Sequence, residues 1–121
     1  MLITKRTDAT EEMMIVGLAG DFDLGAVASV RSVFHEVTND GWSMVLVDLS
    51  EVSFVDSAAL GVLIGLHRRC RMKNGQCVLV AAQPEVVRLL EVTDLDKLFL
   101  TATSVEAAAV LASQQQAASR S

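Results

Sequence analysis

Apolar and polar residues along the chain follow two alternating patterns, one typical of strands and one typical of helices. Apolar runs predict five strands, over residues 2–7, 13–19, 42–49, 77–82 and 97–100. Apolar residues spaced by three and four predict four helices, which begin near Asp23, at Asp56 or Ser57, within 83–85 and within 103–106. Asp23 can cap the first of these helices, and 103–106 fits a capping box.

Two strands followed by alternating helices and strands predict an α/β fold with a single layered domain over residues 1–121. We expect a mixed sheet of about five strands with about four helices, in an order that the sequence leaves open. The first two strands are predicted to pair antiparallel, and the later ones to be parallel with right-handed crossovers. In the last helix Ala107, Val110 and Leu111 are predicted to face inward, and 114–121 reads as a frayed tail.

The stretch 45–70 organises this pattern. A continuous apolar run over 45–49, interrupted only by Asp48, predicts a central strand covered on both faces, followed by a connection over 50–55. The helix after it has an inward stripe made of Ala59, Leu60, Leu63, Leu66 and Cys70. Its N-terminus carries a partial positive charge and tolerates an anion, so a hydroxyl there could accept a phosphoryl group. On spacing alone, Ser57 as a simple cap is the stronger interpretation.

Three segments together resemble the STAS family, and within it the bacterial anti-sigma factor antagonists. The segment 54–63, Phe-Val-Asp-Ser-Ala-Ala-Leu-Gly-Val-Leu, is similar to the family's phosphorylation site, with Ser57 at the position of the phospho-acceptor. The segment 20–23, Gly-Asp-Phe-Asp, is similar to the residues before the family's first helix, and 89–99 to the end of its third helix. One departure is Ala58-Ala59, where the family usually has Ser or Thr followed by Gly.

The resemblance implies a binding module switched by phosphate. Unphosphorylated, it would bind an anti-sigma factor that is also a serine kinase and release a sigma factor; phosphorylation of Ser57 would end the binding, and a phosphatase would reset it. The implied partner-binding residues are Asp21, Asp23, Asp56, Ser57, Ala58, Leu60 and Gly61. A STAS interaction module that is never phosphorylated remains an alternative, because Ala58-Ala59 is unusual.

Composition narrows the possible partners. The net charge of −5 and an aromatic content of 4% disfavour direct binding of nucleic acid, which needs cationic contacts and stacking side chains. No apolar run approaches the ~20 residues of a membrane helix, and residues 1–6 do not resemble a signal peptide. We therefore expect a cytoplasmic protein without a membrane contact. Cys70 and Cys77 are expected to be reduced core thiols.

Two other classes of function compete with the binding module. A receiver domain phosphorylated on aspartate could use Asp48, but it also needs an acidic pair, which Asp21 and Asp23 imitate, and a lysine that ends the last strand. Lys97 instead begins its predicted strand. An enzyme with a Ser57 nucleophile lacks a supporting elbow motif, and no histidine is placed to serve as its base. The spacing of His, Cys and Asp predicts no metal site or cofactor, and there is no phosphate-binding loop.

Overall fold

A five-stranded mixed sheet organises the computed structural model, which describes the backbone of residues 1–120 and the side chains of residues 1–114. Its strands, in sequence order, are β1 (Leu2–Thr7), β2 (Met14–Phe22), β3 (Met44–Val55), β4 (Gln76–Val80) and β5 (Leu100–Ala102). They lie side by side in that same order. β1 pairs antiparallel with β2, and the other three pairs are parallel. The predicted α/β class and mixed sheet are confirmed.

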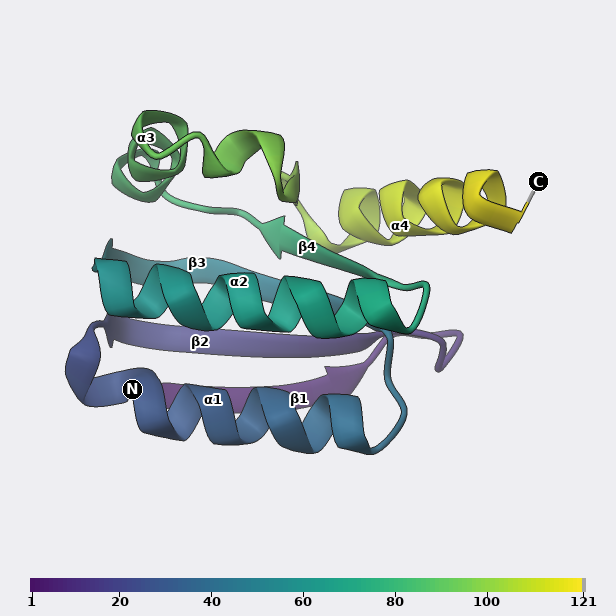
Figure 1. The fold of residues 1–121 in the computed structure, drawn as a ribbon, viewed down its shortest axis with the longest axis horizontal. Helices are drawn as coiled ribbons and strands as arrows, with labels where there is room; N and C mark the ends of the chain where they lie inside the picture. The colour runs from purple at the N-terminus through teal and green to yellow at the C-terminus, as the bar shows by residue number, and fades with distance from the viewer. Residues whose placement is uncertain (121) are drawn as a thin grey trace.

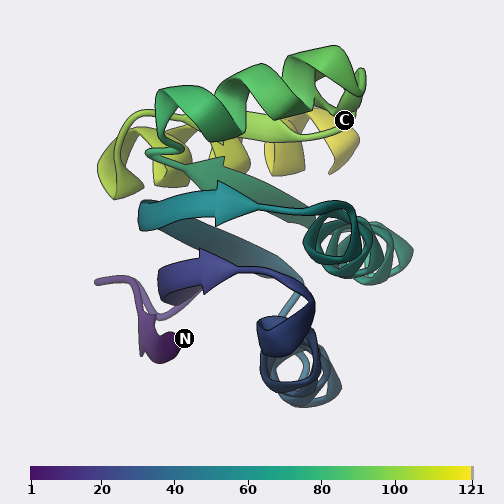
Figure 2. The same ribbon diagram turned by 90° about the vertical axis from the view of Figure 1, so that its left-hand side faces the viewer.

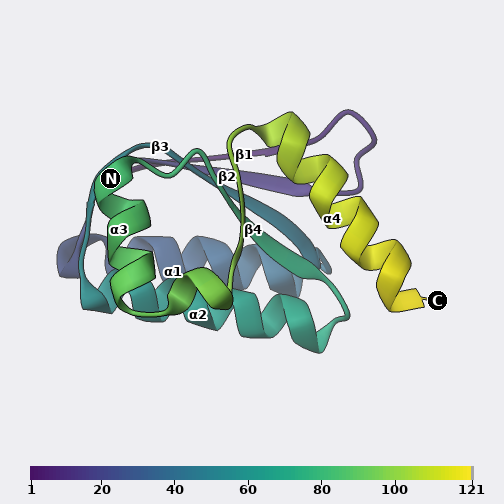
Figure 3. The same cartoon turned by 90° about the horizontal axis from the view of Figure 1, so that it is seen from above.

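Four α-helices and one short 3₁₀ helix flank this sheet. They are α1 (Leu24–Asn39), α2 (Ser57–Met72), α3 (Pro84–Val92), η1 (Leu95–Lys97) and α4 (Val105–Arg120). α1 and α2 lie side by side on one face of the sheet, as Figures 1 and 2 show. Seen from above, α4 lies on the opposite side of the sheet from α1 and α2 (Figure 3). The predicted frayed tail over 114–121 remains a prediction, since Ser121 and the side chains of 115–120 lie outside the described residues.

Two apolar cores hold the layers together. The larger core lies between the sheet and α1, α2 and α3, and it contains the predicted helix stripes, including Phe34 and Leu63, which are fully buried. The smaller core lies under α4, where Ala108 and Ala112 cover Leu46 and Val78. The predicted central strand is therefore apolar on both faces, because each face meets a different set of helices.

Strands β2 and β3 are both longer than the sequence pattern predicts. The predicted break over 20–23 and the predicted connection over 50–55 are largely strand, because Phe22, Val52 and Val55 bury their side chains in the larger core. The register between β2 and β3 shifts twice, from Gly17 to residue 19 and from there to Asp21. Extra residues in β3 at these irregularities interrupt the period of two, which hides the strand from a pattern search.

The C-terminal part also differs from the prediction. In the segment predicted as strand 97–100, the first residue is the end of η1, and only the last residue belongs to β5. In α4 the fully buried residues are Ala108 and Ala112. Of the three residues predicted to face inward, Leu111 packs against the smaller core, whereas Ala107 is exposed and Val110 is 58% exposed, so the prediction was wrong for these two. The cap is Ser104, whose hydroxyl accepts a hydrogen bond from the N–H of Ala107 at 3.0 Å; the predicted capping box is thus displaced by one residue.

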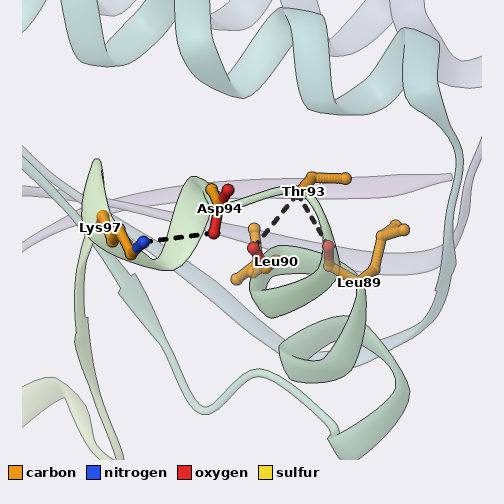
Figure 4. Close-up of polar contacts among 5 residues, drawn as sticks. All are labelled: Leu89, Leu90, Thr93, Asp94 and Lys97. Atoms are coloured by element: carbon orange, nitrogen blue, oxygen red, sulfur yellow. Dashed lines mark hydrogen bonds and ion pairs between the residues drawn. The ribbon is translucent and has the colours of Figure 1, made fainter.

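The end of α3 is closed by local hydrogen bonds (Figure 4). The Thr93 hydroxyl donates to the carbonyl oxygens of Leu89 at 2.8 Å and Leu90 at 3.2 Å. Asp94 then takes a left-handed conformation, with φ of 60°, and its carboxylate pairs with Lys97 at 3.4 Å. This turn breaks the helix and leads the chain into η1, which explains why the segment begins no strand at residue 97.

Candidate functional site

The candidate site lies where two neighbouring parallel strands end and two helices begin. Phe22 and Val55, the last residues of β2 and β3, are partners across the sheet. α1 starts two residues after Phe22, and α2 starts two residues after Val55. The two helix N-termini therefore meet at one edge of the sheet, visible on the left of Figure 1. Most of the partner-binding residues predicted from the sequence lie at this edge.

Asp56 occupies the centre of this edge and contacts both helices. Its Oδ1 accepts a hydrogen bond from the N–H of Ala59 at 2.9 Å, which caps α2. Its Oδ2 accepts one from the N–H of Leu24 at 2.9 Å, which satisfies the first turn of α1. Its own N–H donates to the carbonyl oxygen of Phe22 at 3.3 Å. Asp56 is thus the cap of α2, and it takes over the side-chain cap that the sequence assigned to Asp23.

Ser57 is the first residue of α2, and it is exposed. The N–H groups of Ala59 and Leu60 already donate to the Asp56 carboxylate and carbonyl. The first two N–H groups of a helix have no partner inside it, so those of Ser57 and Ala58 remain for water or an anion. An added negative charge at Ser57 would therefore lie at the positive end of α2 without removing its cap.

The other nominated residues occupy three different environments. Asp21 is exposed, and its Oδ1 accepts a hydrogen bond of 3.5 Å from the hydroxyl of Ser53. Asp23 is half-buried and is the N-cap residue of α1, as predicted, but its side chain makes no capping hydrogen bond. Gly61 is exposed one turn beyond Ser57. Leu60 is only 6% exposed and belongs to the core, which leaves it little surface for a partner.

The two alanines that depart from the family pattern fit the helix without strain. Ala58 is half-buried and Ala59 is fully buried, and neither has a positive φ. Because alanine is the residue most favourable to a helix interior, the substitution supports the first turn of α2. The conformational freedom of a glycine is not needed at residue 59 in this structure.

Two exposed apolar residues border the site and were absent from the sequence-based list of binding residues. Leu24 is 73% exposed at the start of α1, and Phe54 is 51% exposed near the end of β3. Phe54 also lines a shallow pocket of about 220 Å³ with Glu85 and Leu89 of α3. The sequence could have indicated Phe54 as a binding residue, because Phe54 lies in the segment that resembles the family's phosphorylation site. It gave no such indication for Leu24, which precedes the apolar stripe of its helix.

The arrangement that a receiver domain requires does not form. Asp48 lies within β3, where its Oδ1 accepts a hydrogen bond from the N–H of Ser50 at 3.0 Å, several residues before the strand ends. Lys97 lies in η1 before β5 and pairs with Asp94. Among the residues that the structure describes, no three His, Cys, Asp or Glu side chains are grouped to hold a metal ion.

Both cysteines are buried free thiols, as the sequence predicts. Burial raises the pKa of Cys70 to about 12, against the smaller opposing effect of the charges on Arg69 and Lys73. Burial also raises the pKa of Cys77 well above its ordinary value, with a further contribution from Cys70. Neither thiol is a candidate nucleophile, because thiolate is required for that chemistry.

Comparison with known proteins shows the class of domain to which this mixed sheet and its helices belong. The chain belongs to the STAS domain family, whose model matches residues 4–108. It is 31% identical to a STAS-domain containing protein of Pseudomonas aeruginosa over 82% of this chain and 97% of the relative.

Two further similar proteins have names that state a function. The anti-sigma-B factor antagonist of Listeria monocytogenes is 30% identical over 64% of this chain and 68% of the relative. The solved structure of the Bacillus cell fate determinant SpoIIAA in its phosphorylated form has a TM-score of 0.71 at 22% identity, covering 91% of this chain and 99% of that one. In the described part of this chain, no helix is both long and apolar enough to cross a membrane.

Proposed function

We propose that this chain is an anti-sigma factor antagonist whose binding is switched by phosphorylation of Ser57. Unphosphorylated, it binds an anti-sigma factor that is also a serine kinase, so that a sigma factor is released. The phosphorylated form dissociates, and a phosphatase acting on phospho-Ser57 restores it. The chain itself performs no catalysis and acts in the cytoplasm as one domain over residues 1–121. The observation that carries the proposal is the exposed Ser57 at the start of α2, beside a helix cap that Ser57 does not supply.

The comparisons support the class of partner. The Listeria relative is named an anti-sigma factor antagonist, and the SpoIIAA structure is of a phosphorylated form. The proposed partner surface consists of Asp21, Asp23, Asp56, Ser57, Ala58 and Gly61, to which we add the exposed Leu24 and Phe54. An apolar pair beside carboxylates suits a partner that offers a small apolar contact, basic side chains opposite Asp21 and Asp23, and a carboxylate close to the hydroxyl of Ser57.

Release follows from charge and bulk at Ser57. A phosphate adds about −1.5 to −2 charges. Against a partner carboxylate ~4 Å away, each pair of unit charges costs on the order of 4 kcal/mol near a protein surface. Since about 1.4 kcal/mol changes a dissociation constant tenfold, this repulsion weakens binding by several powers of ten. The Asp56 caps remain in place, so the two helices keep their positions and the switch is local.

The decisive experiment incubates the chain with a candidate anti-sigma factor and ATP, followed by mass spectrometry of its peptides. We expect one phosphate on the peptide that contains Ser57 and none on the Ser57→Ala variant. In pull-downs, Ser57→Ala should retain the anti-sigma factor and Ser57→Asp should lose it. Phosphate on another residue, or equal retention of both variants, would refute the switch. Binding without any phosphate transfer would favour the alternative of an unphosphorylated interaction module.

A further inference from the structure

The outer face of α2 is uncovered along its whole length. The buried side of this helix faces the sheet, and the opposite side consists of Ser57, Gly61, Gly65, Arg68 and Met72. Within the described residues, α1 lies beside it on one side, His67 contacts Phe99 of the segment before β5 on the other, and no element lies over it (Figures 1 and 2). We refer to these five residues as the outer face of α2.

The two ends of this face carry opposite charges. Asp21 and Asp23 lie at the same edge of the sheet as the N-terminal end, where the carboxylate of Asp56 is occupied by its two capping hydrogen bonds. Arg68 and Arg69 lie in the C-terminal half of α2, and burial, together with the like charge of Arg31 on α1, lowers the pKa of Arg69.

These arginines have no carboxylate partner within the described residues. The ion pairs of residues 1–114 are Lys5 with Glu36 and Lys97 with Asp94. The Nε of Arg69 is buried and has no hydrogen-bond partner. Neither end of the outer face is therefore neutralised by the chain itself.

Exposed apolar side chains also lie at both ends. Met72, the last residue of α2, is 83% exposed, and Phe54, just before α2, is 51% exposed. Between them the helix has two glycines, Gly61 and Gly65, near its centre. A Cβ added to Gly61 would meet nothing within 4 Å, and one added to Gly65 would meet only the Nη1 of Arg69, at 3.4 Å. Another helix can therefore approach the backbone closely at this point.

We propose that the outer face of α2 binds the same face of a second copy of this chain, with the two helices antiparallel. A two-fold axis brings each acidic end over a basic end, so one set of residues supplies both halves of the contact. An axis over Leu63 places Gly61 against Gly65 of the second copy. It also places Arg68 and Arg69 of one copy at the level of Ala58 and Ser57 of the other. Charge and close backbone approach are thus satisfied by a single register.

Self-association of this kind would cover Ser57 and exclude the anti-sigma factor from it. A phosphate on Ser57 would lie beside Arg68 and Arg69 of the second copy, so it would strengthen the homodimer while it weakens binding to the anti-sigma factor. This second consequence rests on the proposed function, whereas the homodimer itself does not. The released, phosphorylated form would then be stored as a dimer.

Sedimentation velocity over a range of protein concentrations tests the contact without any kinase. We expect the wild-type chain to shift from one chain mass toward two as concentration rises, and Gly61→Leu to remain a monomer. Gly61→Leu should still fold, because its side chain enters open space and leucine favours a helix more than glycine does. The matched control is Ala107→Leu, which adds the same side chain to an exposed position on α4. A wild type that stays monomeric, or a Gly61→Leu variant that dimerises equally, would overturn the proposal.

A second set of variants tests the charges. Ser57→Asp should tighten the dimer several-fold at low salt, and added salt should reduce this gain, since exposed charges are screened. In a background of Arg68→Glu and Arg69→Glu, the same Ser57→Asp change should no longer tighten it. A Ser57→Asp variant that dimerises less than wild type would contradict the antiparallel register. Because anti-sigma factor is absent, these results stand whether or not Ser57 is a kinase substrate.

Discussion

One carboxylate, that of Asp56, links the beginnings of α1 and α2. Its two oxygens accept hydrogen bonds from Ala59 and from Leu24, which is 32 residues away in sequence. The sequence narrowed the cap of α2 to Asp56 or Ser57, because both residue types cap helices well. It assigned the cap of α1 to Asp23 on the same grounds. A contact between segments so far apart leaves no local pattern, which is why this second role was missed.

Replacing Asp56 by alanine should lower the stability of the chain substantially. Each lost capping interaction costs about 1 kcal/mol, so we expect the free energy of unfolding to fall by about 2 kcal/mol. Asp23→Ala is the matched control, since Asp23 has the N-cap position of α1 but makes no capping hydrogen bond; it should cost less than about 0.5 kcal/mol. Urea denaturation of both variants measures the difference. Equal losses would show that Asp56 does not hold the two helices.

At the scale of elements, regular segments were predictable and irregular ones were not. The stripe of α2 repeats every three or four residues, and all five of its predicted residues are buried. In β3 the register shifts break the period of two, so its last six residues were read as a connection. In α4 the small residues Ala108 and Ala112 are buried in the smaller core, and of the residues expected there only Leu111 packs against it, because the alanine-rich sequence of this helix leaves its apolar face ambiguous.

A substitution at Gly75, in the turn from α2 to β4, tests how closely the backbone of this turn packs against Ser43. A Cβ at Gly75 would lie 1.9 Å from the carbonyl oxygen of Ser43, which also accepts the N–H of Gln76 at 2.9 Å. Gly75→Ala must therefore displace the start of β4, and we expect it to cost at least about 3 kcal/mol. Gly61→Ala should instead raise stability by up to about 1 kcal/mol, because its Cβ meets open space in a helix. Thermal unfolding of the pair measures both effects, and similar midpoints would contradict the close approach at Ser43.

For the whole molecule, the order of apolar segments determined the class of fold but not the arrangement of its strands. Alternating helices and strands pack as layers of helices on a sheet, and the two consecutive strands at the beginning of the chain predicted an antiparallel pair. That the five strands lie in sequence order depends on which helix covers which face, and this is decided by packing across the sheet. The candidate site follows from that arrangement: only when β2 and β3 are neighbours do Asp21, Asp23 and Ser57 come to one edge.

The stability of the whole chain should depend on pH through His67. Its ring packs edge-on against Phe99, with 5.5 Å between ring centres, so it joins α2 to the segment before β5. Burial, and then the positive charge of Arg71, lowers the pKa of His67 below its ordinary value of 6.5. The unfolded chain therefore binds a proton more readily than the folded one. As pH falls below 6.5, the free energy of unfolding should decrease, and this loss should level off once the folded form is protonated.

Urea denaturation between about pH 7.5 and pH 5 measures this dependence in the range where histidine titrates. His67→Gln should remove the part of the slope that belongs to His67, whereas His35→Gln, at an exposed position on α1, should retain it. Asp8, whose pKa is lowered chiefly by a hydrogen bond from the Thr10 hydroxyl, titrates at lower pH and contributes mainly below this window. If wild type and His67→Gln lose stability in parallel across the window, His67 is as free to take a proton in the folded chain as in the unfolded one.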